Sequence, residues 1–108
     1  MSVITLPGVL NSATAFLGNA AVTSNDFTSV GQKLFGFKTI ATQPGTVQVF
    51  WTDVVSGTAR SVASAVTVAA NELDIQVLDF PTSGGYNVVY TNTNNTAGTV
   101  TIVVAERM

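Results

Sequence analysis

The sequence predicts an all-β domain, an antiparallel β-sandwich that is jelly-roll-like. Short segments alternate between apolar and polar residues, which places successive side chains on opposite faces of a strand. Clusters of Gly, Pro, Asn and Ser separate these segments at intervals of roughly 8–12 residues, the spacing typical of sandwiches and barrels. Outside residues 61–73 no helical period competes. About seven or eight strands are therefore expected to pack as two sheets.

Residues 1–10 are expected to form an N-terminal arm ahead of a single sandwich domain that spans residues 11–108. The arm is apolar and contains a Pro7-Gly8 turn signal. It lies outside the repeating strand pattern, so it could dock on its own sheet or on a neighbouring molecule. The alternative is an ordinary first strand or a loose terminus.

The first half of the domain contains two weak and two clear candidate strands. Residues 11–23 hold two short ones on either side of Gly18-Asn19, and Asp26-Phe27 follow in a turn-rich segment. Residues 34–42 alternate, so that one face carries Phe35, Phe37, Thr39 and Ala41 and the other Gly36, Lys38, Ile40 and Thr42. Gln43-Pro44-Gly45 is the expected turn, with Pro at the first corner and Gly at the second. The following strand, residues 46–53, has on one face Val47, Val49 and Trp51.

After a turn at Ser56-Gly57, residues 60–68 are expected to form a strand. Alanines here would also suit a helix, but alternation and several β-branched valines favour the strand. Asn71-Glu72 then turns the chain into a strand over residues 73–80. Its faces alternate between Leu73, Ile75 and Val77 on one side and Asp74, Gln76 and Leu78 on the other.

The last two strands, residues 86–92 and 99–105, are expected to pair as a β-hairpin. The segment between them is made of Asn, Thr, Ala and Gly, several of which tolerate turn conformations. Alternation puts three residues of the first strand on one of its faces: Tyr86, Val88 and Tyr90. It likewise puts three residues of the second strand on one face: Val100, Ile102 and Val104. A hairpin cannot bury its apolar face alone, so earlier strands must cover it.

Composition limits the function classes. The 108 residues suffice for one domain, and only 9% of them are charged, against roughly 25% in an average soluble domain. With so few charges, separate copies of the chain repel each other only weakly. This indicates a surface that is covered by neighbours in an assembly. The 4 Lys and Arg residues are scattered, so no nucleic-acid partner is expected.

Cysteine is absent, which excludes disulfides and thiolate chemistry. No cationic segment precedes an apolar one in the manner of a signal peptide. The longest weakly polar run, residues 61–70, is shorter than the ~20 residues of a membrane span. We therefore expect a protein made in a cytoplasm, with no membrane partner.

Without His or Cys, an enzyme would have to use carboxylates. Glu72 and Asp74 are two residues apart but flank a turn, where acidic residues are ordinarily solvated. Calcium is the other carboxylate option, with oxygen ligands from Asp26, Asp53 or the 92–95 loop, although no Asp-x-Asp-x-Asp spacing is present. We expect no enzymatic activity, no catalytic residues, no metal site and no cofactor.

The aromatic residues offer a carbohydrate-binding alternative. Exposed rings of Trp51, Tyr86 and Tyr90 could stack on sugar faces. Each shares its strand face with valines, however, so packing in the sandwich core, with polar tips bonded at the rim, is the favoured interpretation.

The order of several short motifs resembles a β-sandwich module that recurs in bacteriophage virion proteins. The matching segments run through most of residues 11–106: Asn11-Ser12-x-Thr14, Leu17-Gly18, Asp26-Phe27, Gln43-Pro44-Gly45-Thr46-Val47-x-Val49, and Gly85-Tyr86-x-Val88-x-Tyr90-Thr91-Asn92. Two segments depart from the commoner form: residues 53–57 lack its Ser-x-Asp-Gly turn, and Asn87 and Val89 stand where arginines are frequent. The departures weaken the link to tail or baseplate proteins in particular.

The resemblance implies a virion structural role, and a small free-standing module suits a capsid decoration, or cement, protein. Such proteins commonly bind as trimers to the outside of the major capsid protein shell, which implies a homo-oligomer on the virion surface. A tail, neck or head-fibre component is the alternative. Because the arm is apolar, we expect contacts to the capsid or to other subunits from Val3, Ile4, Leu6, Pro7, Val9 and Leu10.

Overall fold

The computed structural model describes residues 5–25, 27–28, 34–52, 57–61, 64–79 and 85–107. Within these ranges the chain forms strands joined by turns and loops, and no helix. The strands are β1 (Thr5–Phe16), β2 (Ala21–Thr23), β3 (Phe27–Thr28), β4 (Leu34–Ala41), β5 (Gly45–Thr52), β6 (Ala59–Ser61), β7 (Val66–Val68), β8 (Asp74–Asp79), β9 (Gly85–Asn92) and β10 (Gly98–Arg107). The all-β expectation is confirmed.

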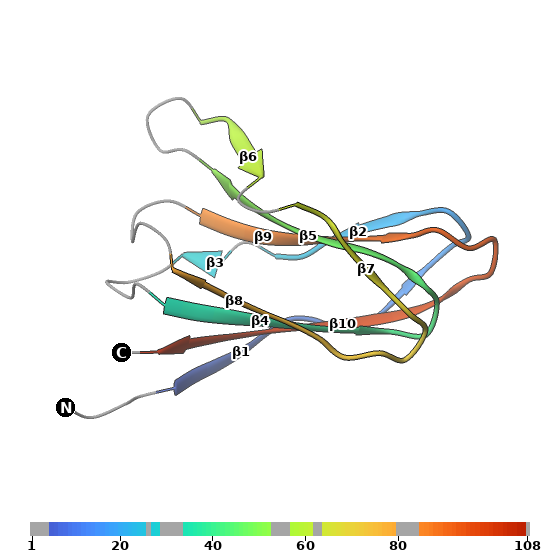
Figure 1. The fold of residues 1–108 in the computed structure, drawn as a ribbon, viewed down its shortest axis with the longest axis horizontal. Coiled ribbons are helices and arrows are strands. Elements are labelled where there is room, and N and C mark those ends of the chain that lie inside the picture. Colours follow the sequence, from blue (N-terminus) through green and yellow to red (C-terminus); the bar gives the residue numbers. More distant parts are fainter. Residues whose placement is uncertain are drawn as a thin grey trace.

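The strands form two antiparallel sheets that pack face to face (Figure 1). The first sheet has the order β1-β10-β4-β8. The second has the order β2-β9-β5-β6, with β3 also pairing with β9 and β7 also pairing with β5. Because β2 and β3 share one partner strand, as do β6 and β7, each sheet has four strand positions. Most connections between these positions cross from one sheet to the other, which is the jelly-roll arrangement.

The predicted C-terminal hairpin is wrong. β9 lies in the second sheet beside β5 and β2, whereas β10 lies in the first sheet between β1 and β4. The loop over residues 93–97 therefore crosses between the layers rather than turning within one. The physical reason is long-range pairing: in the first sheet β10 has a partner strand on each side, β1 and β4, while its apolar face is still buried across the sandwich.

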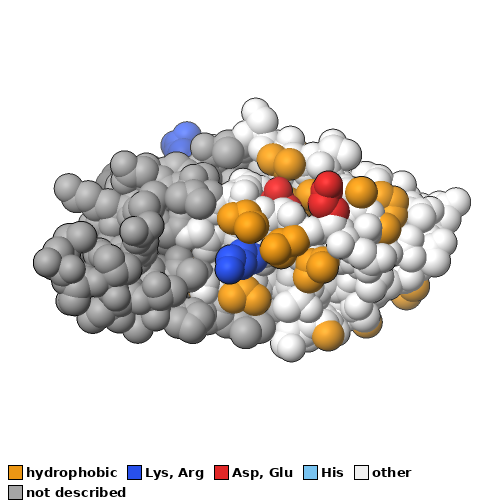
Figure 2. Space-filling model, turned by 60° about the horizontal axis from the view of Figure 1, so that its bottom comes forward, with side chains coloured by type: hydrophobic (Ala, Val, Ile, Leu, Met, Phe, Trp, Pro, Cys, Tyr) orange, Lys and Arg blue, Asp and Glu red, His pale blue; other side chains and the backbone are white. Residues whose placement is uncertain are grey.

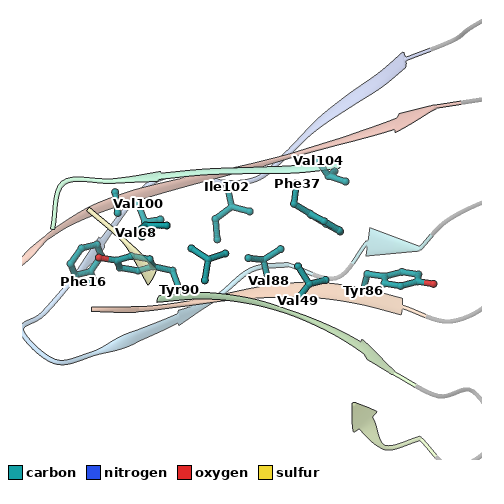
Figure 3. Close-up of a cluster of buried hydrophobic side chains, with 12 residues drawn as sticks. Phe16, Phe37, Val49, Val68, Tyr86, Val88, Tyr90, Val100, Ile102 and Val104 are labelled. Atoms are coloured by element: carbon teal, nitrogen blue, oxygen red, sulfur yellow. The ribbon is translucent and has the colours of Figure 1, made fainter. Parts of the chain in front are cut away.

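The predicted inward faces are confirmed. Tyr86, Val88 and Tyr90 of β9 face Val100, Ile102 and Val104 of β10 across the interior (Figure 3). The other buried hydrophobic residues are Phe16, Phe37, Ala41, Val47, Val49 and Val68. Trp51 is partly buried and packs against this cluster. Alternation along β4, β5, β9 and β10 thus builds one continuous core, whereas two residues of the apolar side predicted for residues 73–80, Leu73 and Ile75, are exposed.

Two expectations about local geometry need correction. The strand expected over residues 60–68 is interrupted, since Ser64 and Ala65 lie outside any strand. Its two ends, β6 and β7, pair with opposite ends of β5. Gly45 begins β5 and is not among the residues with positive φ. Glycine is required there by space instead, because a Cβ would lie 2.1 Å from the Thr91 carbonyl oxygen.

β1 contains an irregularity that no sequence signal indicated. Its register against β10 shifts between Val9 and Asn11 and again between Asn11 and Thr14. Ala13 has a φ of 43° at the second shift, and its N–H donates to Thr101 Oγ1 at 3.0 Å. A bulge of this kind bends the edge strand and limits its pairing with other chains.

Candidate binding surfaces

Three connecting segments meet at one end of the sandwich and form what we call the loop end: residues 17–20, 42–44 and 93–97. In Figure 1 this end lies opposite the two termini. The segments contain no charged residue. Their side chains and backbone groups bond to one another, so the surface is polar, uncharged and held in one arrangement.

Asn92 is the centre of this network. Its side chain is 1% exposed. Nδ2 donates to the Leu17 carbonyl at 3.1 Å and to the Thr96 carbonyl at 2.9 Å, while Oδ1 accepts from the Asn94 N–H at 3.0 Å. One buried amide therefore ties the β1–β2 loop to the β9–β10 loop.

Further bonds join the same loops at the surface. Asn19 donates its backbone N–H to the Asn94 carbonyl at 2.8 Å and its Nδ2 to Asn95 Oδ1 at 2.7 Å. A Cβ on Gly18 would lie 2.2 Å from the Asn95 carbonyl oxygen, so the close approach of the loops requires glycine. Leu17, beside this contact, is 75% exposed. The hydrogen-bonded loops therefore hold the apolar side chain of Leu17 exposed to solvent.

Gln43 connects the third segment. Its Oε1 accepts from Asn94 Nδ2 at 2.9 Å, and its backbone carbonyl accepts the hydroxyl of Tyr90. The phenol of Tyr90 therefore reaches from the core to the loop end, as expected for a buried ring with a polar tip at the rim.

Two of the three rings considered for sugar stacking are buried in the core. Tyr86 and Tyr90 have no exposed surface, and burial raises the pKa of both phenols. Phe16 packs on Tyr90 with ring centroids 5.1 Å apart. Trp51 is partly buried against the core. Packing in the core accounts for the positions of the two tyrosines.

The carboxylates weighed for chemistry are held by local contacts. Glu72 Oε1 accepts from the Ala69 N–H, and Asp74 Oδ2 accepts from Gln76 Nε2, both at 3.0 Å. Asp26 and Asp53 lie outside the described residues. Among the described residues no group of three or more potential ligands could hold a metal ion. The amides of the 92–95 loop bond to protein groups, as described above.

The expected contact residues of the arm fall into two groups. Val3 and Ile4 lie outside the described residues. Leu6, Pro7, Val9 and Leu10 belong to β1, whose backbone pairs with β10 from Thr5 opposite Arg107 onward. Residues 5–10 therefore continue the first sheet, the alternative considered for this segment. Their role in contacts to a capsid or to other subunits stays a prediction.

Sequence reasoning did not single out the loop end or the exposed Leu17. The available signal was the run of Asn and Thr around residues 91–96 together with Gly18-Asn19, which indicated turns but not their mutual contact. In the described part of the chain, no helix has the length and hydropathy to cross a membrane.

Comparisons with known proteins place the fold. No family model and no curated protein sequence matches the chain. The solved structure of the PBSX exported protein XepA superposes with a TM-score of 0.75 at 17% identity, over 94% of this chain and 36% of that one. A structure of infectious bursal disease virus, Gx strain, superposes with a TM-score of 0.57 at 10% identity, over 98% of this chain and 32% of that one.

A third structure is the D114A mutant of CBM29-2, a family 29 carbohydrate-binding module. It has a TM-score of 0.50 at 10% identity and covers 95% of this chain and 86% of that one. The chain spans about a third of the length of the first two neighbours. At these identities the likeness shows a shared β-sandwich fold.

Proposed function

We propose that the chain is a bacteriophage structural protein of the virion, a capsid decoration (cement) protein that binds the outside of the major capsid protein shell and stabilises it. The observation that carries the proposal is the jelly roll itself, which is shared over nearly the whole chain with a virus structure and with the PBSX exported protein. The motif resemblance to phage virion modules supports the same class. Homotrimer formation on the capsid surface is part of this proposal.

The loop end supports a role in an assembly. Its amides and hydroxyls bond to one another, and its segments carry no charge, so a neighbouring subunit could cover it at a small desolvation cost. A contact of about 800 Å² per partner would occupy about one seventh of the 5762 Å² surface of the chain. Binding only to the assembled shell stabilises that state by mass action and needs no chemistry.

The N-terminal residues remain the proposed capsid contact. The start of β1 and the loop end lie at opposite ends of the longest dimension, 44 Å (Figure 1). A subunit standing on its N-terminal end would direct the loop end away from the shell, where a neighbouring copy of this chain, and not the capsid, could cover it.

The first experiment is to count copies of the chain in purified particles of the source virus by quantitative mass spectrometry against the major capsid protein. A fixed ratio at high copy number is expected. A few copies per particle would instead indicate a tail, neck or head-fibre component. Absence from the particles would overturn the virion role and leave a carbohydrate-binding module as the alternative.

A rebinding experiment locates the contact. Deleting residues 2–4 leaves every described residue of β1 in place, so this variant should fold and yet fail to rebind particles stripped of the protein. Leu17→Asp at the loop end is the matched control and should rebind normally. The reverse result would show that the capsid contact is at the loop end and not at the arm.

A further inference from the structure

The outer face of the first sheet carries a small apolar patch with charges of both signs. We call it the outer patch: Ile40, Leu73 and Ile75, with Lys38 and Glu72 beside them. The apolar side chains are 39%, 51% and 55% exposed, respectively. Figure 2 looks toward this face and shows hydrophobic side chains gathered around a basic one, with acidic side chains next to them.

Strand pairing brings these residues together. Lys38 on β4 is directly opposite Ile75 on β8, so the two side chains share the outer face. Ile40 follows Lys38 by two residues on the same face, and Leu73, two residues before Ile75, directly precedes β8. Glu72 is exposed in the turn before Leu73, where its Oε1 accepts from the Ala69 N–H. Lys38 thus lies at the strand side of the apolar side chains and Glu72 at their turn side.

The concentration of these side chains on one face is unusual for this chain. Among the residues whose side-chain exposure the structure describes, the exposed large hydrophobics are Leu17, Ile40, Val66, Leu73 and Ile75, and three of these five belong to the outer patch. Charged residues are rare in the sequence, at 9%. Single exposed apolar side chains need no explanation, but contiguous ones rimmed by polar groups mark interaction sites.

We propose that a second copy of this chain binds the outer patch through a twofold contact. A twofold axis through the apolar centre brings Lys38 of each copy beside Glu72 of the other, so a single arrangement forms two equivalent ion pairs around buried Ile and Leu side chains. This self-complementarity is the requirement of a closed, isologous interface. A different partner would have to present a negative group to Lys38 and a positive group to Glu72. A second copy of the patch already supplies both.

Edge-to-edge pairing of β8 is disfavoured by the sequence of that strand. Antiparallel pairing of residues 74–79 with themselves brings Asp74 opposite Asp79, and like charges directly opposite destabilise a strand pair. Repulsion in this fully overlapping register favours a contact between sheet faces over an extension of the sheet.

This inference goes beyond the proposed function, whose trimer would form on the capsid, and it is tested on the isolated chain, so it can fail while the capsid role stands. A twofold contact produces a dimer by itself, whereas a trimer has to use another surface. Sedimentation equilibrium separates the two, since one chain has a mass of 11.2 kDa. The expected mass at high concentration is twice that of one chain.

Ile75→Lys should weaken dimerisation by at least about 100-fold, because the substitution occurs on both sides of the symmetric contact. Val66→Lys, on β7 of the other sheet and 38% exposed, is the matched control and should leave the dimer unchanged. Ile75→Thr, which keeps a β-branched side chain, should weaken it less. Far-UV circular dichroism and melting curves confirm that each variant is folded.

A charge exchange tests the symmetry. Lys38→Glu should weaken the dimer by about tenfold, because it replaces two attractive pairs by two repulsive ones. Lys38→Glu combined with Glu72→Lys should restore it. A chain that stays monomeric at every concentration, or an oligomer whose size Ile75→Lys leaves unchanged, would overturn the proposal. Failure of the exchange to restore association would overturn the reciprocal pairing of Lys38 with Glu72.

Discussion

Asn92 provides the sharpest test of how the loop end is held together. Substitution by alanine removes three hydrogen bonds from a side chain that is 1% exposed. Each such bond contributes about 1 kcal/mol net, and the carbonyls of Leu17 and Thr96 lose their donor, so Asn92→Ala should lower the free energy of unfolding by about 3 kcal/mol. For a domain of this size the melting temperature should fall by more than about 10 °C.

The matched control is Asn95→Ala. It lies in the same loop but is exposed, and its side chain accepts one bond, from Asn19 Nδ2. Water can replace that bond, so a loss of at most about 0.5 kcal/mol is expected. Urea unfolding measures both variants, with the slope m unchanged because the surface exposed on unfolding is the same. Equal losses for the two variants would refute the assignment of Asn92 as the residue that joins the loops.

Three further predictions follow from the described residues. Ala13→Gly should raise the free energy of unfolding by about 0.5–1 kcal/mol, because φ at this position is 43°, whereas Ala15→Gly in the same strand should lower it by a similar amount; chemical denaturation compares them. Thr39 Oγ1 is buried without a hydrogen-bond partner among the described residues, so Thr39→Val should stabilise by about 1 kcal/mol, and a loss of stability would show a bond that the hydroxyl makes. Burial raises the pKa of Tyr86 and Tyr90, so the folded state holds these two protons more tightly than the unfolded state does. The contribution of these tyrosines to the free energy of unfolding should be constant below 10.0, the pKa of an unperturbed tyrosine, and should fall as the pH rises above it. Melting curves recorded over a range of pH measure this change.

The inward faces could be predicted because alternation is a local property. Val47 and Val49, or Val100 and Ile102, face inward in any arrangement that buries one side of their strand. The turn at Gly18-Asn19 was predictable for a similar reason, since Asn19 adopts the positive φ that asparagine tolerates.

The choice between a hairpin and a crossing connection was not predictable from the same pattern. A short loop after Asn92 can turn within a sheet or pass to the opposite sheet, and both arrangements bury the same residues of β9 and β10. What decides is the pairing of β10 with β1 and β4, which are distant in sequence. The break between β6 and β7 is likewise a matter of pairing, since these two short strands pair with opposite ends of β5.

The candidate surfaces were still harder to predict. The outward position of Ile40 follows from alternation, but its proximity to Ile75 depends on the pairing of β4 with β8. The contacts of Asn92 and Asn94 with Leu17 and Gln43 join loops from three parts of the chain. Propensity and spacing indicate turns at these places but contain no information about which turns meet.

The position of β10 has a consequence for the order in which the first sheet can form. β10 lies between β1 and β4, so among the described residues β1 has no neighbour in its sheet until residues 98–107 pair with it. The pairing of β1 with β10 joins residues that are far apart in sequence, and the loop-closure entropy must be overcome before this contact contributes any stability. The first sheet should therefore be completed late in folding, and until then β1 and β4 expose the edges that β10 later occupies.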